Sequence, residues 1–295
     1  MKAKFFLASM VFPLAVLAIS SCVKDDPQTA DCAEEHEVIF DVDFADATRT
    51  PFKPQGDVSA INWDNIDNSQ IHLYENGKEG KNTKITVKDG TVKVSSTFSI
   101  LNLIKFKGFK YNCVIARDYS DNVLSIPTVQ SPKLSTPDPA AEVIIAEASY
   151  SGIIRPIISG VKLDFEYCNV LTQLNFMGMK AGDVIKRIEI TADKNIAGAF
   201  MKLDGSDFVP YSVGGSNKVT LLPVDYNTVA ADGAFFTCFS SLPAELDAFS
   251  VKVVTEDKVY EKSLPKVFDK CLVIASNASN YANFVFSEKD IKYTK

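Results

Sequence analysis

Short stretches in which apolar and polar residues alternate recur along most of this chain, and they constrain its fold more than any other feature. The first is EVIFDVDF at residues 37–44, where Val38, Phe40, Val42 and Phe44 occupy every second position. A period of two places the apolar side chains on one face of a strand and the polar ones on the other. Comparable runs are QIHLY, KITVK, TVKVS, YNCVIA, VIIAEA, VKLDFEY, QLNFM, IKRIEIT, KVTLLP, FFTCFS, FSVKVVT, KVYEKS and NFVFS.

Turn signals separate these runs. Asn76-Gly77 and Asp89-Gly90 adopt positive φ at low cost and favour tight hairpins. Asp204-Gly205 and Gly214-Gly215 mark further turns. No long run with helical periodicity appears. Short alternating strands with turns between them are typical of β-sandwiches, so we expect an all-β fold.

The N-terminus has the features of an export signal. Two lysines precede an apolar run at residues 5–18, which is shorter than the roughly 20 residues of a spanning helix but suits a signal peptide. Residues 19–22, ISSC, resemble a bacterial lipobox, in which small residues precede the cysteine that takes the lipid. We expect signal peptidase to cut between Ser21 and Cys22 and the lipid to be attached to Cys22. The alternative is an ordinary signal peptide followed by a chance cysteine.

The residues directly after this cysteine indicate where the protein is displayed. Lys24, Asp25 and Asp26 resemble the signal that takes lipoproteins of Bacteroidota to the outer face of the outer membrane. The alternative is a solvated linker, because residues 25–37 are acidic and contain Pro27. We expect display at the cell surface, with the lipid holding the chain in the outer membrane.

Charge and cysteine content limit the partners and the covalent structure. The net charge of −6 becomes −8 when cleavage removes Lys2 and Lys4, and an acidic chain with two histidines and no basic cluster is poorly suited to nucleic acid. Besides Cys22 there are five cysteines, an odd number, so at least one lies outside any intramolecular disulfide. Their wide spacing contains no CxxC pair, and we expect buried thiols. They are Cys32, Cys113, Cys168, Cys238 and Cys271.

The chain length suits one large domain or two of ordinary size, and each half would be long enough for one β-sandwich. The segment SGIIRPIISG at residues 151–160 precedes the long alternation VKLDFEYCNVLTQLNF, and we place the boundary there. The expected divisions are a signal peptide at 1–21, an acidic linker at 22–36, an N-terminal β-sandwich at 37–155 and a C-terminal β-sandwich at 156–295.

The order of these pieces resembles the fimbrillin family, the lipoprotein pilins and adhesins of Bacteroidota. The resemblance rests on EVIFDVDFADATRT, INWDNIDNSQIHLY, YNCVIA with IPTVQSP, EVIIAEASY with VKLDFEYCNVLTQLNF, IKRIEITADKNIAGAF and FFTCFSSLPAELDAFSVKVVTEDKVYEKSL. It implies two tandem transthyretin-like β-sandwich domains behind a lipoprotein signal peptide. Asn169, near a place where many members carry histidine, and the cysteines depart from the family pattern.

The resemblance also implies a route of assembly. In the family a protease cuts after an arginine in an early loop, and loss of the first strand leaves a groove that a partner subunit's extended segment fills. Here the strand is Val38 to Phe44, and the candidate cleavage site is Arg49-Thr50 in the loop that follows. An uncut arginine is the alternative, which suits an anchor or a stand-alone surface protein. The C-terminal tail has few apolar alternating positions beyond Phe286, so we expect the chain to accept a strand and not to donate one.

No residue pattern for catalysis or for a cofactor emerges. His36 falls in the expected linker and His72 within a strand, so we expect structural or surface roles for both. Without a third histidine or a Cys/His cluster, zinc and Ser-His-Asp sites lack support. Trp63 suits a core position better than a sugar platform. A polar stretch resembles a calcium loop in composition but lacks the loop's glycine and distal glutamate. Its members are Asp64, Asn65, Asp67 and Asn68.

These observations favour a fimbrial subunit, at the tip or as an accessory, or a cell-surface adhesin assembled by β-strand exchange. The expected partners are other fimbrial subunits, the outer membrane through the lipid, and a host protein or glycan, without nucleic acid, metal or cofactor. A glycan-binding surface lipoprotein is the alternative, although a single Trp leaves few aromatic platforms. A surface hydrolase is the third and least supported reading.

Overall fold

Strands dominate the computed structural model, which describes residues 35–43, 66–99, 108–117, 119–133, 136–152, 156–264, 272–274 and 279–294. Within those ranges the other regular elements are the 3-10 turns η2 (Asn68–Gln70), η4 (Pro139–Ala141) and η5 (Glu288–Asp290), and there is no α-helix. The expected all-β class is therefore confirmed.

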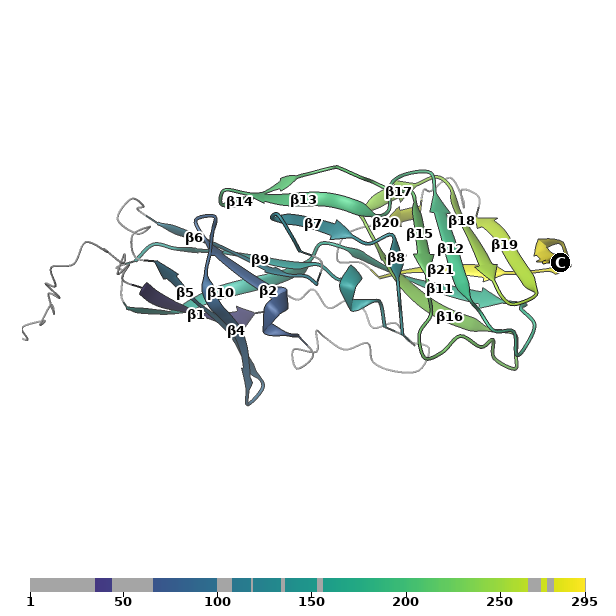
Figure 1. Ribbon diagram of the computed structural model, residues 1–295, viewed down its shortest axis with the longest axis horizontal. Coiled ribbons are helices and arrows are strands. Elements are labelled where there is room, and N and C mark those ends of the chain that lie inside the picture. The colour runs from purple at the N-terminus through teal and green to yellow at the C-terminus, as the bar shows by residue number, and fades with distance from the viewer. Residues whose placement is uncertain are drawn as a thin grey trace, which may run out of the picture. The chain divides into compact units, whose positions relative to one another are not determined.

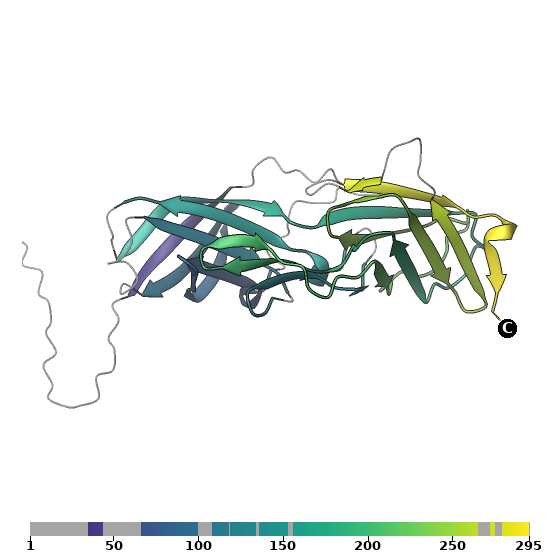
Figure 2. The ribbon, with the colours of Figure 1, turned by 90° about the horizontal axis from the view of Figure 1, so that it is seen from above.

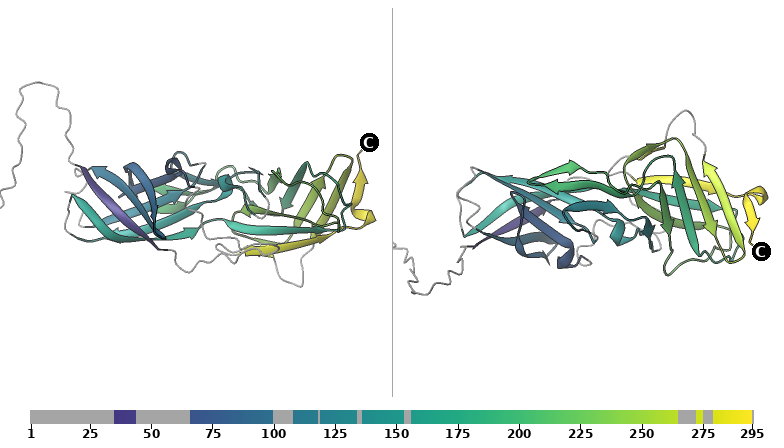
Figure 3. Two further views of the ribbon diagram at one scale, coloured as in Figure 1. Left: turned by 90° about the horizontal axis from the view of Figure 1, so that it is seen from below. Right: turned by 45° about the horizontal axis from the view of Figure 1, so that its top comes forward.

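The N-terminal part of the chain forms an eight-stranded sheet in the order β3-β2-β6-β9-β10-β1-β5-β4 (Figure 1). Its neighbouring strands are antiparallel, except that β1 and β10 are parallel. The first described strand, β1, thus lies inside the sheet, drawn in purple between blue and teal strands in Figure 3. The bounds are β1 Glu35–Asp43, β2 Ile71–Glu75, β3 Lys78–Glu79, β4 Lys81–Lys88, β5 Thr91–Ser99, β6 Phe109–Ile115, β9 Ile144–Tyr150 and β10 Ile157–Tyr167.

The C-terminal part contains a six-stranded sheet, β22-β19-β18-β12-β15-β8, and a three-stranded sheet, β16-β11-β21. A two-stranded ribbon pairs β17 with β20, and a further sheet, β14-β13-β7, lies against the first sheet, as Figure 2 shows in green. The bounds are β7 Val123–Ile126, β8 Val129–Gln130, β11 Val170–Met177, β12 Arg187–Ala192, β13 Gly198–Asp204, β14 Asp207–Pro210, β15 Lys218–Leu221, β16 Phe235–Ser241, β17 Ala244–Leu246, β18 Phe249–Val254, β19 Lys258–Leu264, β20 Leu272–Ile274, β21 Ser279–Val285 and β22 Ile291–Tyr293.

Two of the expected hairpin turns form as the Asx-Gly pairs require. Asn76 and Gly77, between β2 and β3, have φ of 48° and 77°, and Asp89 and Gly90, between β4 and β5, have φ of 50° and 75°. Positive φ at both central residues matches the right-handed twist of the flanking strands. Gly77 also meets a second turn, because a Cβ built on it would lie 2.1 Å from the carbonyl oxygen of Gly205.

Two large apolar cores follow from the alternation of side chains along strands that are buried on both faces. In β6, Tyr111 and Cys113 belong to the core of the first sheet, whereas Val114, the residue after Cys113, points to the other face and belongs to a core shared with the C-terminal strands. In β9, Ile144 and Ile145 divide in the same way. The strands β6 and β9 therefore connect the two cores.

A buried glutamine explains one of the motifs noted in the sequence. Gln130, in IPTVQSP, donates from Nε2 to the carbonyl of Ser240 at 2.8 Å and accepts from the Ser240 N–H at 3.0 Å. The Nδ2 of Asn169 donates to the hydroxyl of the same serine at 2.9 Å. Both side chains thereby satisfy polar groups of β16 that are fully buried.

The chain crosses from the first sheet to the C-terminal strands twice, first at β7 and finally after β10, and this differs from the single boundary that we expected between residues 155 and 156. Strand β10, which we expected in the C-terminal domain, pairs with β1 and β9, whereas β7 and β8, expected in the N-terminal domain, pair with β13 and β15. The final crossing lies at Cys168 and Asn169, between β10 and β11. The apolar alternation continues through β10 into β11, so the sequence pattern does not mark the change of sheet.

A candidate strand-exchange site

Strand β1 lies where an exchangeable strand would have to lie. On one side Val38 is opposite Ile158 of β10, and on the other it is opposite Ser96 of β5. The N–H of Glu37 also donates to the carbonyl of Pro156 at 2.9 Å, just before β10 begins. Removing β1 would therefore leave unpaired backbone groups on two strands, which is the template that strand addition requires.

The inner face of β1 fills the first core. Val38 and Phe40 are fully buried, and the ring of Phe40 meets the ring of Tyr111 edge to face at 4.9 Å between centroids. Val42 packs on the same core from its margin. Burying side chains of this size contributes about 1.5–3 kcal/mol each, so the inner face is the main apolar contribution of β1 to stability.

His36 corrects an expectation, because it lies in β1 and not in a linker. It is 1% exposed, and its Nε2 lies 3.0 Å from Oε1 of Glu75, which is equally buried. The hydroxyl of Tyr111 donates to the same carboxylate oxygen at 3.0 Å. A buried carboxylate is costly unless it is paired and hydrogen-bonded, so β1 supplies one of the partners that Glu75 needs. The period of two that links His36 to Val38 is the sequence signal that places it inward.

The outer face of β1 contributes much less. Glu35 lies 3.1 Å from Nζ of Lys81, and Asp41 lies 3.3 Å from Nζ of Lys93. All four side chains are substantially exposed, and exposed ion pairs contribute about 0–1 kcal/mol. The strand is therefore held by its backbone and its inner face.

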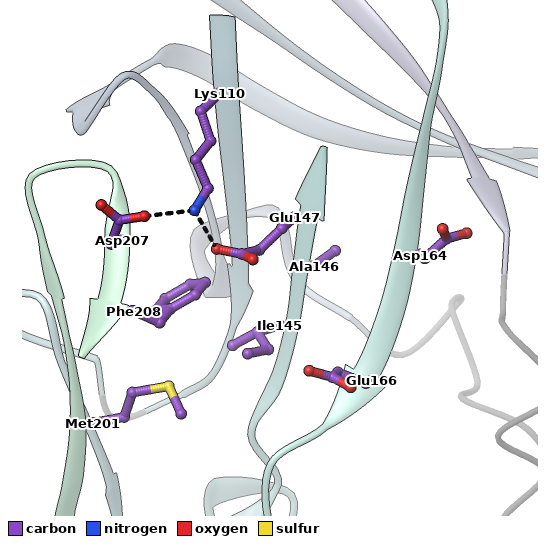
Figure 4. A pocket seen from close by; sticks show the side chains of 9 residues that line it. All are labelled: Lys110, Ile145, Ala146, Glu147, Asp164, Glu166, Met201, Asp207 and Phe208. Atoms are coloured by element: carbon purple, nitrogen blue, oxygen red, sulfur yellow. Dashed lines mark hydrogen bonds and ion pairs between the residues drawn. The ribbon is translucent and has the colours of Figure 1, made fainter. Parts of the chain in front are cut away.

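A second feature is a cleft of about 440 Å³ between the β13–β14 hairpin and the outer face of the first sheet (Figure 4). The Nζ of Lys110 bridges Asp207 at 2.7 Å and Glu147 at 3.0 Å, and the hydrogen bond with Asp207 is the main cause that raises the pKa of Lys110. The other lining residues are Ile145, Ala146, Asp164, Glu166, Met201 and Phe208. Sequence reasoning did not find this cleft, because its residues come from five strands far apart in the chain.

The residues predicted for anchoring, export and maturation lie outside the described residues. They include the signal peptidase site, the export signal and the candidate protease site that follows β1. Their assignments therefore remain predictions from the sequence. These residues are Ser21, Cys22, Lys24, Asp25, Asp26, Arg49 and Thr50.

The side chains considered for metal binding or acid–base chemistry, His72, Asp67 and Asn68, form hydrogen bonds with neighbouring protein groups. His72 lies 2.7 Å from Glu79 and its ring is 4.7 Å from that of Tyr119. In the polar stretch, Asp67 accepts the N–H of Ser69 at 2.8 Å, which caps η2, and Asn68 accepts the N–H of Ile85. Asp64, Asn65 and Trp63 lie outside the described residues. Among the residues that are described, no three His, Cys, Asp or Glu side chains are grouped to hold a metal ion.

Three of the cysteines are buried thiols. Cys113, Cys168 and Cys238 are each at most 9% exposed and form no disulfide. Burial raises the pKa of Cys113, and burial together with the charge of Glu166 raises that of Cys168 to about 12. The raised pKa keeps the thiols of Cys113 and Cys168 protonated at neutral pH and chemically quiet. Cys32 and Cys271 lie outside the described residues.

A search of the described part of the chain finds no helix long and apolar enough to cross a membrane.

Comparisons with known proteins find a likeness in structure and none in sequence. No protein-family model matches the sequence, and no curated protein matches it. A protein from Bacteroides ovatus assigned to cell adhesion is similar in structure, with a TM-score of 0.50 and 14% identity over 90% of this chain and 97% of that one. At this identity the likeness shows a shared fold.

Two solved structures that are less similar to this chain are those of fimbrial proteins. The fimbrial anchor protein Mfa2 from Porphyromonas gingivalis has a TM-score of 0.35 and 10% identity, over 74% of this chain and 77% of that one. A fimbrial assembly protein from Parabacteroides distasonis has a TM-score of 0.38 and 8% identity, over 88% of this chain and 93% of that one.

Proposed function

We propose that this protein is a lipid-anchored surface subunit of a fimbrium, at the tip or as an accessory, or an adhesin, and that it assembles by accepting a β-strand. The observation that carries the proposal is the position of β1, which fills a gap between β5 and β10. It is the first described strand of the chain, and it precedes Arg49. One cut after Arg49 would therefore separate it from the rest of the sheet.

Release of β1 would create both parts of an acceptor groove. The backbone edges of β10 and β5 would lose their partners, and the sites of Val38 and Phe40 would open in the core. Glu75 would in addition lose its contact with His36. A donor strand from another subunit restores pairing on both edges when its apolar side chains alternate as those of β1 do.

The C-terminal tail supports the acceptor role over the donor role. Its last strand, β22, pairs with β19 at the margin of the six-stranded sheet. Ile291 is half-buried there, whereas Tyr293 is 74% exposed. A segment already engaged in its own sheet, with little apolar alternation, is a poor donor. A subunit that accepts a strand and donates none would serve as a tip or accessory subunit.

Anchoring completes the proposal. Lipid on Cys22 holds the precursor in the outer membrane, and Lys24, Asp25 and Asp26 direct it to the outer leaflet. Partners are then other fimbrial subunits and, through the exposed surface, a host protein or glycan. Without cleavage at Arg49 the lipid and β1 stay in place, and the protein acts as a surface adhesin on its own.

Limited trypsin digestion of the mature protein tests strand acceptance. Mass spectrometry should find a cut at Arg49, and displacement of β1 should lower the thermal stability of the product, because buried side chains and two strand edges are lost. A synthetic peptide with the sequence of residues 35–43 should restore the melting temperature. The same peptide with Phe40→Asp should not restore it, because a charge would enter the apolar site.

A matched peptide with Ile39→Thr provides the control, because Ile39 lies on the other face of β1 and is only half-buried. It should restore stability nearly as well as the unchanged peptide. Equal rescue by the Phe40→Asp peptide, or a protein that trypsin leaves intact at Arg49, would remove strand exchange and leave the stand-alone adhesin.

A further inference from the structure

The hairpin formed by β4 and β5 carries a charge opposite to that of the whole protein. Residues 81–97, named here the lysine hairpin, contain four lysines and one acid, Asp89, in a chain with a net charge of −6. Strand β4 is an edge strand of its sheet, and Figure 1 shows the tip of the β4–β5 hairpin projecting beyond the neighbouring strands. The sequence has no run of adjacent lysines here, and pairing of the strands is what gathers them.

The strand register places each lysine beside a hydroxyl group. Because side chains on one face recur at every second position, and a bulge between Lys81 and Lys84 keeps both on the same face, the four pairs share one surface. The cross-strand pairs are Lys81 with Thr97, Lys84 with Ser95, Thr86 with Lys93, and Lys88 with Thr91.

Two of these lysines are open to a ligand. Lys81 and Lys93 contact Glu35 and Asp41 of β1, whereas Lys84 and Lys88 are exposed and form no ion pair within the described residues. At the rise of an extended strand, their Cα atoms are about 13 Å apart. Thr86 stands between them on the same face and is also exposed.

Ammonium groups separated by hydroxyls match a ligand with anionic groups separated by hydroxyls. We infer that the lysine hairpin binds an anionic polysaccharide. Its carboxylate or sulfate groups would meet Lys84 and Lys88, and its hydroxyls would exchange hydrogen bonds with Thr86 and Thr91. Residues 81–97 contain no aromatic side chain, so the surface lacks the stacking platforms on which single-stranded nucleic acid binding relies.

This inference rests on the proposed display at the cell surface and adds a ligand to it. It does not involve strand exchange, because the lysine hairpin is complete in the uncut protein. Lysines on an exposed strand also prevent edge-to-edge aggregation, and that role alone predicts a different result. Replacing them would then cause self-association without any change in polysaccharide binding.

The test uses the purified, uncut lipoprotein in detergent and measures binding to heparin, which is sulfated, and to hyaluronan, which is carboxylated. We expect saturable binding to at least one of them that weakens as salt is added. Lys84→Ala/Lys88→Ala should raise the Kd about tenfold, from the loss of two exposed charge contacts. The matched control is Lys180→Ala/Lys218→Ala, which removes two exposed lysines elsewhere and should change the Kd less than twofold.

Three outcomes would overturn the inference. The first is that neither polysaccharide binds. The second is that the two double variants weaken binding equally, or that the hairpin variant self-associates with unchanged affinity. The third is that double-stranded DNA binds as tightly as the better polysaccharide, which would show a general affinity for polyanions. Trypsin cutting and peptide rescue are measured separately, so each result leaves the strand-exchange test intact.

Discussion

Glu75 is a buried carboxylate beside the first core, and it contacts two buried side chains. Its carboxylate is 1% exposed, lies 3.0 Å from His36, and accepts a hydrogen bond from Tyr111. Glu75→Ala should lower the free energy of unfolding by about 3–5 kcal/mol, because the two partners are left buried without an acceptor. Urea denaturation measures this loss.

The exposed pair formed by His72 of β2 and Glu79 of β3 serves as the comparison for the buried pair. Glu79 lies 2.7 Å from His72 and is about half exposed, so Glu79→Ala should cost less than about 1 kcal/mol. Equal losses for the two variants would mean that the buried pair adds no more to stability than a surface pair.

At the scale of elements, the contact between two glycine turns holds the β2–β3 hairpin against the β13–β14 hairpin. Gly77 and Gly90 have nearly the same φ, 77° and 75°, but a Cβ on Gly77 would meet the Gly205 carbonyl whereas one on Gly90 would meet nothing within 4 Å. Gly90→Ala should therefore cost about 1–2 kcal/mol from backbone strain alone. Gly77→Ala should cost roughly 2–4 kcal/mol, because the turns must also separate. Thermal unfolding of both variants measures the difference, and equal costs would contradict the contact.

The turn η5, which precedes β22, contributes stability that is lost at acid pH. Asp290 accepts the Ser287 hydroxyl at 2.6 Å and the Ser287 N–H at 2.9 Å, and these bonds hold its pKa below the usual range. A lowered folded pKa contributes stability that is present above the unfolded pKa, near 4, and is lost as pH falls through the folded value. The stability difference between the native protein and Asp290→Asn should thus be constant above about pH 5 and shrink below about pH 4.

Unfolding measured across this pH range provides the check. Glu288→Gln is the control, because it removes a carboxylate from the same turn that accepts neither Ser287 bond. A difference between native protein and Asp290→Asn that is the same at every pH would contradict the role of the aspartate.

The sequence predicts the individual strands and hairpins but not the order in which the strands pair. The strands and the Asx-Gly hairpins depend on neighbouring residues, and the period of two and the turn dipeptides locate them. The place of β1 between β5 and β10 depends on pairing with distant segments, and nothing local specifies it. The crossing at Cys168 was missed because the alternation runs through it, and the lysine hairpin was missed because its lysines meet only across strands.

For the whole molecule, the anchor is the first property to test. Cys22→Ala should remove incorporation of a palmitate analogue and leave a soluble or unprocessed protein, because one cysteine carries the entire anchor. Metabolic labelling followed by membrane fractionation measures both effects. Label that persists on the variant would place the lipid elsewhere.

The orientation of the anchored protein is a separate matter. Changing Lys24, Asp25 and Asp26 together to Ala should leave the protein lipidated but facing the periplasm, so that protease added to intact cells no longer digests it. The unchanged protein, digested under the same conditions, is the reference. Continued digestion of the variant would mean that these residues form only a linker.

The parallel pairing of β1 with β10 also has a consequence for the time course of folding. Glu37 is opposite Ile157, so β1 cannot complete its pairing until the distant strand β10 is available. Contacts between such distant segments form slowly, because the loop between them must close first. We therefore expect the pairing of β1 with β10 to be among the last contacts of the first sheet to form, and a chain interrupted before that step would keep one edge of β1 unpaired.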